Sequence, residues 1–205
     1  MPAILEHIRD IRIDAFAENG HHALADALRV VLKIQGLESK PLKVVCIGTD
    51  RSTGDSLGPL VGSMLISAGF AGEVWGTLES PVHAVNLTEI IPRAAGGESA
   101  VIAVDACLGR KTEVGSIMVG VGPVLPGAGL RKRLPGIGDA HVTGVVNVGG
   151  FMDYAILQCT RLYTVVKIAS VISRGLLIAA GQDRFQDHAP SRGQLFTIPW
   201  ARENA

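Results

Sequence analysis

Two aspartates are candidates for chemistry because each follows an apolar run that is typical of a buried strand. Asp55 comes after the run 44–47 and a polar loop, and Asp105 ends the run 101–104. Such runs are typical of parallel sheets, whose strands bring their carboxyl ends to one edge. We therefore expect the two carboxylates to lie close together, where they can share a proton or hold a metal ion. The alternative is that each aspartate caps a helix or a turn.

Three more polar residues are candidates for binding substrate near these aspartates. Asp50 and Arg51 lie in the loop that leads to Asp55, and His83 follows a short predicted strand at the same edge. A histidine at such a place is also commonly a capping or core residue, and this alternative stays open. His83 and His141 are the candidates for a metal ligand, but neither lies in a metal motif such as HExxH. The sequence therefore predicts no cofactor, with nickel or zinc as the alternative.

Two other residues have the character of nucleophiles. Residues 54–58 match the GxSxG nucleophile elbow with Ser56 at its centre, but the elbow sits directly at a strand end. Here the apolar run already stops at Ile47. Cys107 is two residues after Asp105 and has no histidine close to it in the sequence. We therefore expect Ser56 to be a cap or loop hydroxyl and Cys107 to be a reduced core thiol.

The elements that hold these residues follow from the spacing of apolar side chains. Strands are predicted over 44–47, 73–78, 99–105, 116–121 and 140–148. Helices are predicted as a pair within 3–35, after the first strand, over 84–95, and from Asp153 to residue 180. This alternation predicts a three-layer α/β/α sandwich of the phosphorylase/hydrolase-like type. Its sheet is expected to be mostly parallel, with a hairpin-like insertion near one edge.

The predicted organisation has three parts and one long loop. An N-terminal helical segment, residues 1–40, is expected to pack on the core, followed by the α/β domain over 41–180 and a variable C-terminal tail over 181–205. The loop 123–139 is dense in glycine and proline and contains the basic run 131–133. Because loops of this length are often functional, we expect a lid or a substrate-binding segment. A solvated basic run is the alternative.

Composition argues against several partners. The 205 residues include 19 basic and 19 acidic side chains, and this zero net charge disfavours nucleic acid, which is held mainly by positive charge. The longest apolar stretch, 165–181, contains Lys167 and Arg174 and is too short and too polar to span a membrane. The N-terminus has no apolar signal segment. We therefore expect a cytoplasmic protein that binds neither membrane nor nucleic acid.

Four motifs in order give the chain a resemblance to the YyaC-type sporulation proteins. They are Ile-Gly-Thr-Asp-Arg-Ser-Thr-Gly-Asp-Ser-Leu-Gly-Pro at 47–59, Glu-Ser-Pro-Val-His-Ala-Val-Asn-Leu at 79–87, Val-Asp-Ala-Cys-Leu-Gly at 104–109 and Leu-Pro-Gly-Ala-Gly at 125–129. The resemblance extends over residues 41–180. That family is similar in turn to the germination protease of endospore-forming bacteria and to the hydrogenase maturation endopeptidases, which share the predicted fold.

The resemblance implies a sporulation-associated endopeptidase with a peptidase-like domain over 41–180, acting on a protein substrate in the sporulating cell or forespore. Asp55 and Asp105 match the two aspartates of the germination protease. Gly127 and Gly129 match its Pro-Gly-Ser-Gly loop, with alanine in place of the serine. The maturation endopeptidases use two acids and a later histidine to recognise nickel, and His141 is the candidate for that histidine. The alternatives are a binding or regulatory protein on the same scaffold and a metal-assisted hydrolase.

Overall fold

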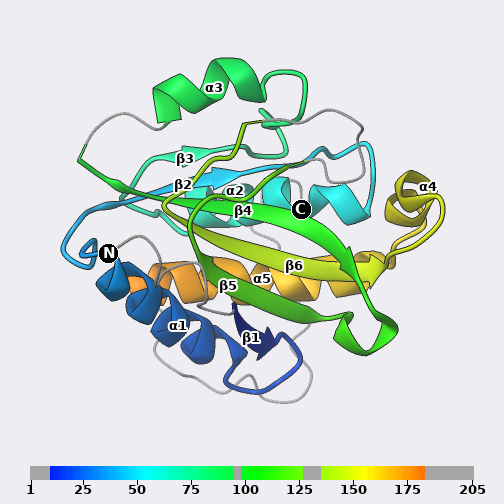
Figure 1. The fold of residues 1–205 in the computed structure, drawn as a ribbon, viewed down its shortest axis with the longest axis horizontal. Coiled ribbons are helices and arrows are strands. Elements are labelled where there is room, and N and C mark those ends of the chain that lie inside the picture. The colour runs from blue at the N-terminus through cyan, green and yellow to red at the C-terminus, as the bar shows by residue number, and fades with distance from the viewer. Residues whose placement is uncertain (1–9, 95–97, 127–134, 183–205) are drawn as a thin grey trace, which may run out of the picture.

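Apolar segments with strand character form a six-stranded sheet in the computed structural model, which describes residues 10–94, 98–126 and 135–182 (Figure 1). The strands are β1 (Ile11–Asp14), β2 (Leu42–Cys46), β3 (Val74–Trp75), β4 (Ala100–Gly109), β5 (Ser116–Val121) and β6 (Ala140–Val148). Their order across the sheet is β1-β5-β6-β4-β2-β3. β6, β4, β2 and β3 run parallel, whereas β5 is antiparallel to both β6 and β1. The predicted mostly parallel sheet is therefore confirmed.

The two central strands are apolar at almost every position because both faces of the sheet are covered there. All of β2 and the first six residues of β4 are buried. Successive side chains of a strand point to opposite faces. Val44 and Ile102 accordingly belong to a large apolar cluster on one face, and Val45 and Val101 belong to a smaller cluster on the other.

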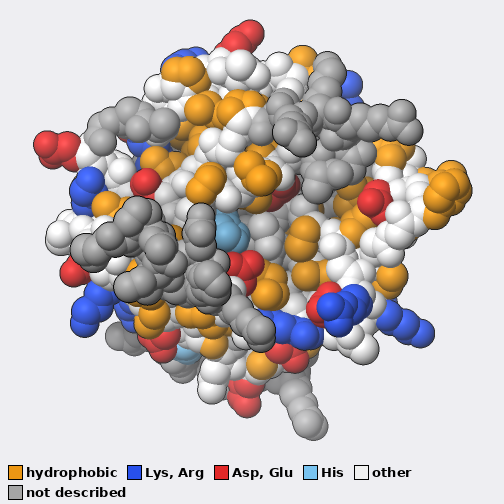
Figure 2. Space-filling view, in the orientation of Figure 1, with side chains coloured by type: hydrophobic (Ala, Val, Ile, Leu, Met, Phe, Trp, Pro, Cys, Tyr) orange, Lys and Arg blue, Asp and Glu red, His pale blue; other side chains and the backbone are white. Residues whose placement is uncertain are grey.

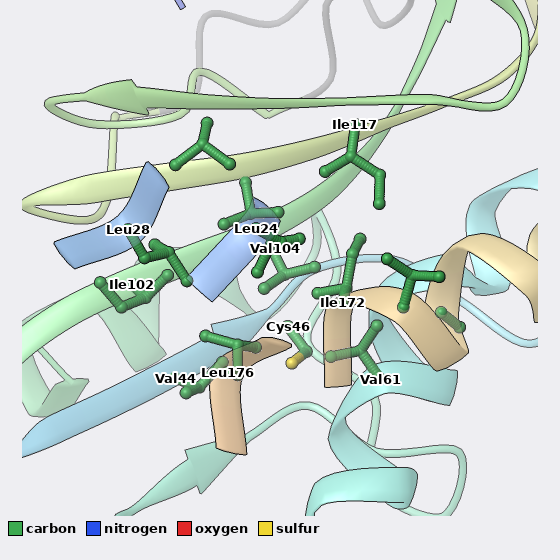
Figure 3. Packing of buried hydrophobic residues seen from close by; sticks show 14 of the residues in the cluster. Leu24, Leu28, Val44, Cys46, Val61, Ile102, Val104, Ile117, Ile172 and Leu176 are labelled. Carbon is green, nitrogen blue, oxygen red and sulfur yellow. The ribbon is translucent and has the colours of Figure 1, made fainter. Parts of the chain in front are cut away.

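Helices cover both faces, so the structure has three layers. The large cluster lies beneath α1 (Gly20–Ile34), α2 (Leu57–Ser67) and α5 (Leu162–Ala179). Figure 3 shows its packing, with Ile172 of α5 close to Cys46 of β2. On the opposite side of the sheet, α3 (Leu87–Ala94) packs against the small cluster (Figure 1). The predicted α/β/α sandwich is confirmed, with one of its outer layers made of a single short helix among the described residues.

The predicted helix from Asp153 to residue 180 is in fact two helices. α4 (Asp153–Gln158) ends where the hydroxyl of Thr160 donates to the carbonyl of Ile156 at 2.9 Å, and Arg161 is extended (φ −68, ψ 117) before α5 begins. α5 is the one helix of the described ranges that is long and apolar enough to cross a membrane. More than half of it is buried inside the fold, which is the behaviour of a core helix.

The N-terminal part also differs from its prediction. Residues 11–14 form the edge strand β1, not a helix, because Ile11 and Ile13 alternate with Arg12 and Asp14, so that only one face of the segment is apolar. β1 pairs antiparallel with β5, and α1 follows it as the predicted second helix. The first 40 residues therefore supply a strand of the sheet as well as a helix. Residues 15–19, the end of the first predicted helix, form turns and not a helix. Residues 1–9 and the tail from residue 183 onward lie outside the described residues.

Candidate active site

Adjacent parallel strands deliver Asp55 and Asp105 to one edge of the sheet. β2 and β4 are neighbours in which Cys46 lies opposite Val104, and Asp105 is the next residue of β4. The chain leaves β2, turns, and returns so that the backbone N–H of Thr49 donates to the carbonyl of Asp55 at 3.1 Å. Asp55 lies in a 3-10 turn, Gly54–Ser56, that leads directly into α2.

The two aspartates line one small pocket of about 60 Å³, which has room for a few water molecules or a peptide carbonyl group. Its lining residues are Ile47, Gly48, Asp55, His83, Ala84, Asp105 and Pro126. The structure therefore brings together three of the predicted site residues, Asp55, Asp105 and His83. The pocket combines these polar groups with an apolar rim, as ligand sites commonly do.

The two carboxyl groups differ in their tendency to ionise. Asp105 is 8% exposed, and burial, followed by the nearby charge of Asp55, raises its pKa from 3.8 to about 8, against a hydrogen bond from the N–H of Ala106. Burial also raises the pKa of Asp55, but the backbone N–H of Thr49 and the proximity of His83 counteract that rise. At neutral pH Asp105 therefore keeps its proton, while Asp55 is the carboxyl group that ionises first.

A backbone bridge places His83 beside the two aspartates. Ile47, just after β2, pairs in parallel with Val82, and the N–H of Gly48 donates to the carbonyl of Val82 at 2.8 Å. The segment after β3 thus runs along the end of β2. This extension of the sheet brings the next residue, His83, to the pocket.

Asn86 fixes the turn that carries His83, a role that sequence reasoning missed. Its Oδ1 accepts the backbone N–H of His83 at 2.8 Å, and its Nδ2 donates to the carbonyl of Pro81 at 3.0 Å. The Nδ1 of His83 accepts the N–H of Val85 at 3.3 Å, so the neutral ring carries its proton on Nε2. The available signal was the asparagine three residues after the histidine, because asparagine side chains commonly bond nearby backbone groups in turns.

Two of the remaining predicted residues, Asp50 and Arg51, do not line the pocket. Asp50 and Arg51 are exposed in the loop, where Asp50 accepts a 3.4 Å hydrogen bond from the hydroxyl of Thr49. Gly127 and Gly129 lie outside the described residues, as does the whole part 127–134 of the predicted loop 123–139 with its basic run. Pro126, which precedes them, does line the pocket, so the chain enters that segment at the site.

His141 lies apart from the pocket in the described structure. It stands opposite Ala103 on β4, its Nδ1 is 3.0 Å from the carbonyl of Gly122, and its Nε2 is 3.5 Å from Asp10. Within residues 10–94, 98–126 and 135–182, no three histidine, cysteine or acidic side chains are grouped to hold a metal ion. Of the two histidines, only His83 accompanies the aspartates.

The surroundings of Ser56 and Cys107, the two alternative nucleophiles, do not favour nucleophilic attack by either side chain. The hydroxyl of Ser56 is directed into its own turn, where it donates to the carbonyl of Thr53 at 2.7 Å. For Cys107, burial in the first place, and then the negative charges nearby, raise the pKa to about 11, although a hydrogen bond with Thr143 acts in the opposite direction. A thiol with that pKa stays protonated at neutral pH, and only the thiolate is a good nucleophile.

Gly48 is expected to be irreplaceable in the loop that returns Asp55 to the strand end. Its φ is +142°, and a Cβ there would overlap the carbonyl oxygen of Asp55. We expect Gly48→Ala to cost at least roughly 1–3 kcal/mol in the free energy of unfolding, measured by urea denaturation. Gly36→Ala is the control, since Gly36 also has a positive φ of +68° but nothing within 4 Å of the added carbon. Equal losses in the two variants would show that backbone strain alone, and not the contact with Asp55, sets the cost.

Fold and pocket together define an α/β/α protein with two carboxyl groups paired at the carboxyl ends of neighbouring parallel strands. The chain belongs to the family described as "Protein of unknown function (DUF1256)", whose family model matches residues 15–175. It is 48% identical over 170 residues to "Uncharacterized protein YyaC" of Bacillus subtilis (strain 168), an alignment that covers 80% of this chain and 83% of that protein. The predicted resemblance to the YyaC-type proteins is therefore confirmed, and the match also includes α1, which the motifs alone left outside it.

Among solved structures, the chain is similar to a NiFe hydrogenase maturation protease, HycI, from Thermococcus kodakarensis KOD1. The sequences are 16% identical and the TM-score is 0.45, with 73% of this chain and 98% of that chain covered.

Proposed function

We propose that the protein is an endopeptidase that hydrolyses a peptide bond of a protein substrate with Asp55 and Asp105. The observation that supports this proposal is the pairing of two carboxyl groups with separated pKa values in one small pocket. Such a pair supplies an acid and a base at the same pH from identical side chains. A binding site for a basic partner would be served better by an open acidic surface, whereas Asp105 is buried.

In the proposed reaction, ionised Asp55 takes a proton from a water molecule as its oxygen attacks the carbonyl carbon of the scissile peptide bond. Protonated Asp105 gives its proton to the carbonyl oxygen, so that a neutral gem-diol forms. Asp55 then gives its proton to the leaving nitrogen while the C–N bond breaks. Asp105 regains a proton from one hydroxyl of the gem-diol as the new carboxyl group forms, and the two side chains return to their starting states.

His83 is proposed to orient the substrate or the water. Its ring faces the pocket, its Nδ1 is occupied by the N–H of Val85, and its proton therefore sits on Nε2. An N–H at that position can donate to an oxygen atom of the substrate. When the ring carries a second proton, its positive charge counteracts the rise in the pKa of Asp55, which favours the ionised state that the base requires.

We also propose that this activity belongs to sporulation and takes place in the cytoplasm of the sporulating cell or forespore. The support is the resemblance of the four motifs to the YyaC-type sporulation proteins and, through them, to the germination protease. Asp50, Arg51 and the glycines of the 125–129 motif are proposed to contact the polypeptide outside the pocket. The reaction as proposed uses no metal ion, because the two carboxyl groups and a water molecule complete the proton transfers.

The proposed activity is tested by incubating the purified protein with extract from sporulating cells and mapping new peptide N-termini. We expect a set of N-termini that the wild type produces and that Asp55→Asn does not. Asp26→Asn is the matched control, because Asp26 is a largely exposed aspartate of α1 that does not line the pocket. If wild type and Asp55→Asn produce the same N-termini, the proposed peptidase is wrong.

A further inference from the structure

Large apolar side chains are exposed at one corner of the molecule, around the start of α4 and the start of α5. Phe151 is 92% exposed and Tyr154 is 68% exposed, values that are unusual for residues of this size. We call the whole set the aromatic patch: Phe16 (47%), Phe151 (92%), Met152 (65%), Tyr154 (68%), Leu162 (58%) and Tyr163 (57%). Figure 2 shows hydrophobic side chains at the edge of the molecule where Figure 1 places α4.

One part of the patch, formed by Phe16 after β1 and by the start of α5, is joined by a contact between segments that are distant in the sequence. The rings of Phe16 and Tyr163 lie 6.2 Å apart, and the guanidinium of Arg161 lies 5.2 Å from the ring of Tyr163. Met152 has a positive φ of +71°, a backbone conformation that residues other than glycine seldom adopt. Within the described ranges it is the only residue other than glycine with a positive φ. Strained positions of this kind are often associated with function, here the display of apolar side chains.

The composition of the patch is that of a protein interface. It contains both tyrosines of the chain, and tyrosine, phenylalanine, methionine and arginine are the residues enriched in such interfaces. The charges at its margin have both signs. Arg161 and Asp153 belong to the patch segments, and the bond from the N–H of Gly149 to the carbonyl of Gly109 brings Arg110 to the same corner.

We propose that the aromatic patch is the interface of a homodimer, with the same patch of a second copy as its occupant. A margin with both signs of charge is complementary to itself when two copies meet about a two-fold axis. The zero net charge of the chain leaves no overall repulsion between copies. With about 200 Å² per aromatic side chain, the exposed parts of the patch amount to roughly 700 Å², close to the 800 Å² or so that each partner contributes to a standard interface.

α4, which carries part of the proposed interface, packs against the turn that carries Asp55. α4 packs on Gly54, where an added Cβ would meet Leu157 and the hydroxyl of Thr160, both at 2.8 Å. A second copy that holds α4 in place therefore also supports the turn next to Asp55. The dimer itself does not depend on the proposed peptidase activity, so the two can be tested separately.

Sedimentation velocity over a wide range of protein concentrations tests the proposal with the full chain. We expect the wild type to sediment at twice its 21.5 kDa mass. Phe151→Ser/Tyr154→Ser should raise the dissociation constant by at least a factor of about a hundred, because truncating one aromatic hot-spot residue costs roughly thirtyfold. Val30→Ser/Ile66→Ser is the matched control, since these side chains are 50% and 55% exposed on other helices and should leave the dimer intact.

The results of these experiments distinguish a homodimer from other partners of the aromatic patch. A wild type that stays monomeric at all concentrations overturns it, as does a dimer that survives in the patch variant and dissociates in the control. A monomer that pellets with anionic phosphatidylserine vesicles only when the patch is intact would assign the surface to membranes and overturn the dimer. Circular dichroism checks that each variant folds, and Leu162→Ser/Tyr163→Ser serves as a second variant if the first does not.

Discussion

Substituting Asp105 with asparagine is expected to lower the proposed peptidase activity by about 10²–10⁴-fold, the usual contribution of a general acid. Asparagine keeps an oxygen for the N–H of Ala106 but has no proton to give to the carbonyl oxygen of the substrate. The same requirement predicts the pH dependence of the wild type. Because the raised pKa of Asp105 is about 8, activity should fall about tenfold for each pH unit above that value.

The measurement is the initial rate of cleavage at one of the mapped sites, followed across the pH range for wild type and variants. Asp26→Asn is again the matched control, because Asp26 is a largely exposed aspartate of α1 and does not line the pocket. We expect this control to reproduce the wild-type rate and its loss of activity above pH 8. A rate that continues to rise well above pH 8 would mean that a protonated Asp105 is not required.

The second large effect concerns stability, and it has the opposite direction. The pKa of Asp105 is raised in the folded protein, so the folded state holds a proton that the unfolded chain has already lost above its ordinary pKa of 3.8. The contribution of Asp105 to stability is therefore fullest below about pH 4, declines as the pH rises toward about 8, and reaches a constant lower level above it. Asp105→Asn removes this ionisation, and should raise the free energy of unfolding by roughly 4 kcal/mol at neutral pH.

Urea unfolding of wild type and Asp105→Asn at about pH 4, 7 and 9 checks this expectation. The two proteins should be similar in acid, and the variant should be more stable at neutral and alkaline pH. Asp55→Asn is an informative comparison, because removing its charge should also relieve the repulsion on ionised Asp105. If Asp105→Asn were less stable than the wild type at alkaline pH, the burial of an ionisable carboxyl group at this position would not be the dominant energetic term.

The energetic cost of burying the carboxyl group of Asp105 in the core is explained if this residue takes part in the reaction. Asp105 is one of few polar residues that the described structure buries, and an apolar or amide side chain there would fit the neighbouring strands at lower cost. Natural proteins tolerate such costs mainly at functional sites. The expected opposite effects of Asp105→Asn on stability and activity would distinguish a site residue from a structural one.

The sequence by itself determined the layers of the fold and the place of the two aspartates. Continuous apolar runs such as 101–104 require cover on both faces, and that requirement alone predicts parallel strands between helices. Since parallel strands share the direction of their ends, Asp55 and Asp105 had to lie at the same edge. Two of the motifs that carry the family resemblance, at 47–59 and 104–109, contain these aspartates and lie at the same edge of the sheet.

Only the tertiary structure decided which other residues join the aspartates and how the carboxyl groups ionise. His83, and not His141, lines the pocket because Val82 pairs with Ile47, a contact between distant segments that no local spacing reveals. The strand β1 likewise depends on pairing with β5. The apolar spacing of this segment is compatible with a helix or with a strand, and the pairing selects the strand. The pKa of Asp105 depends on burial and on the charge of Asp55, and both are properties of packing in three dimensions.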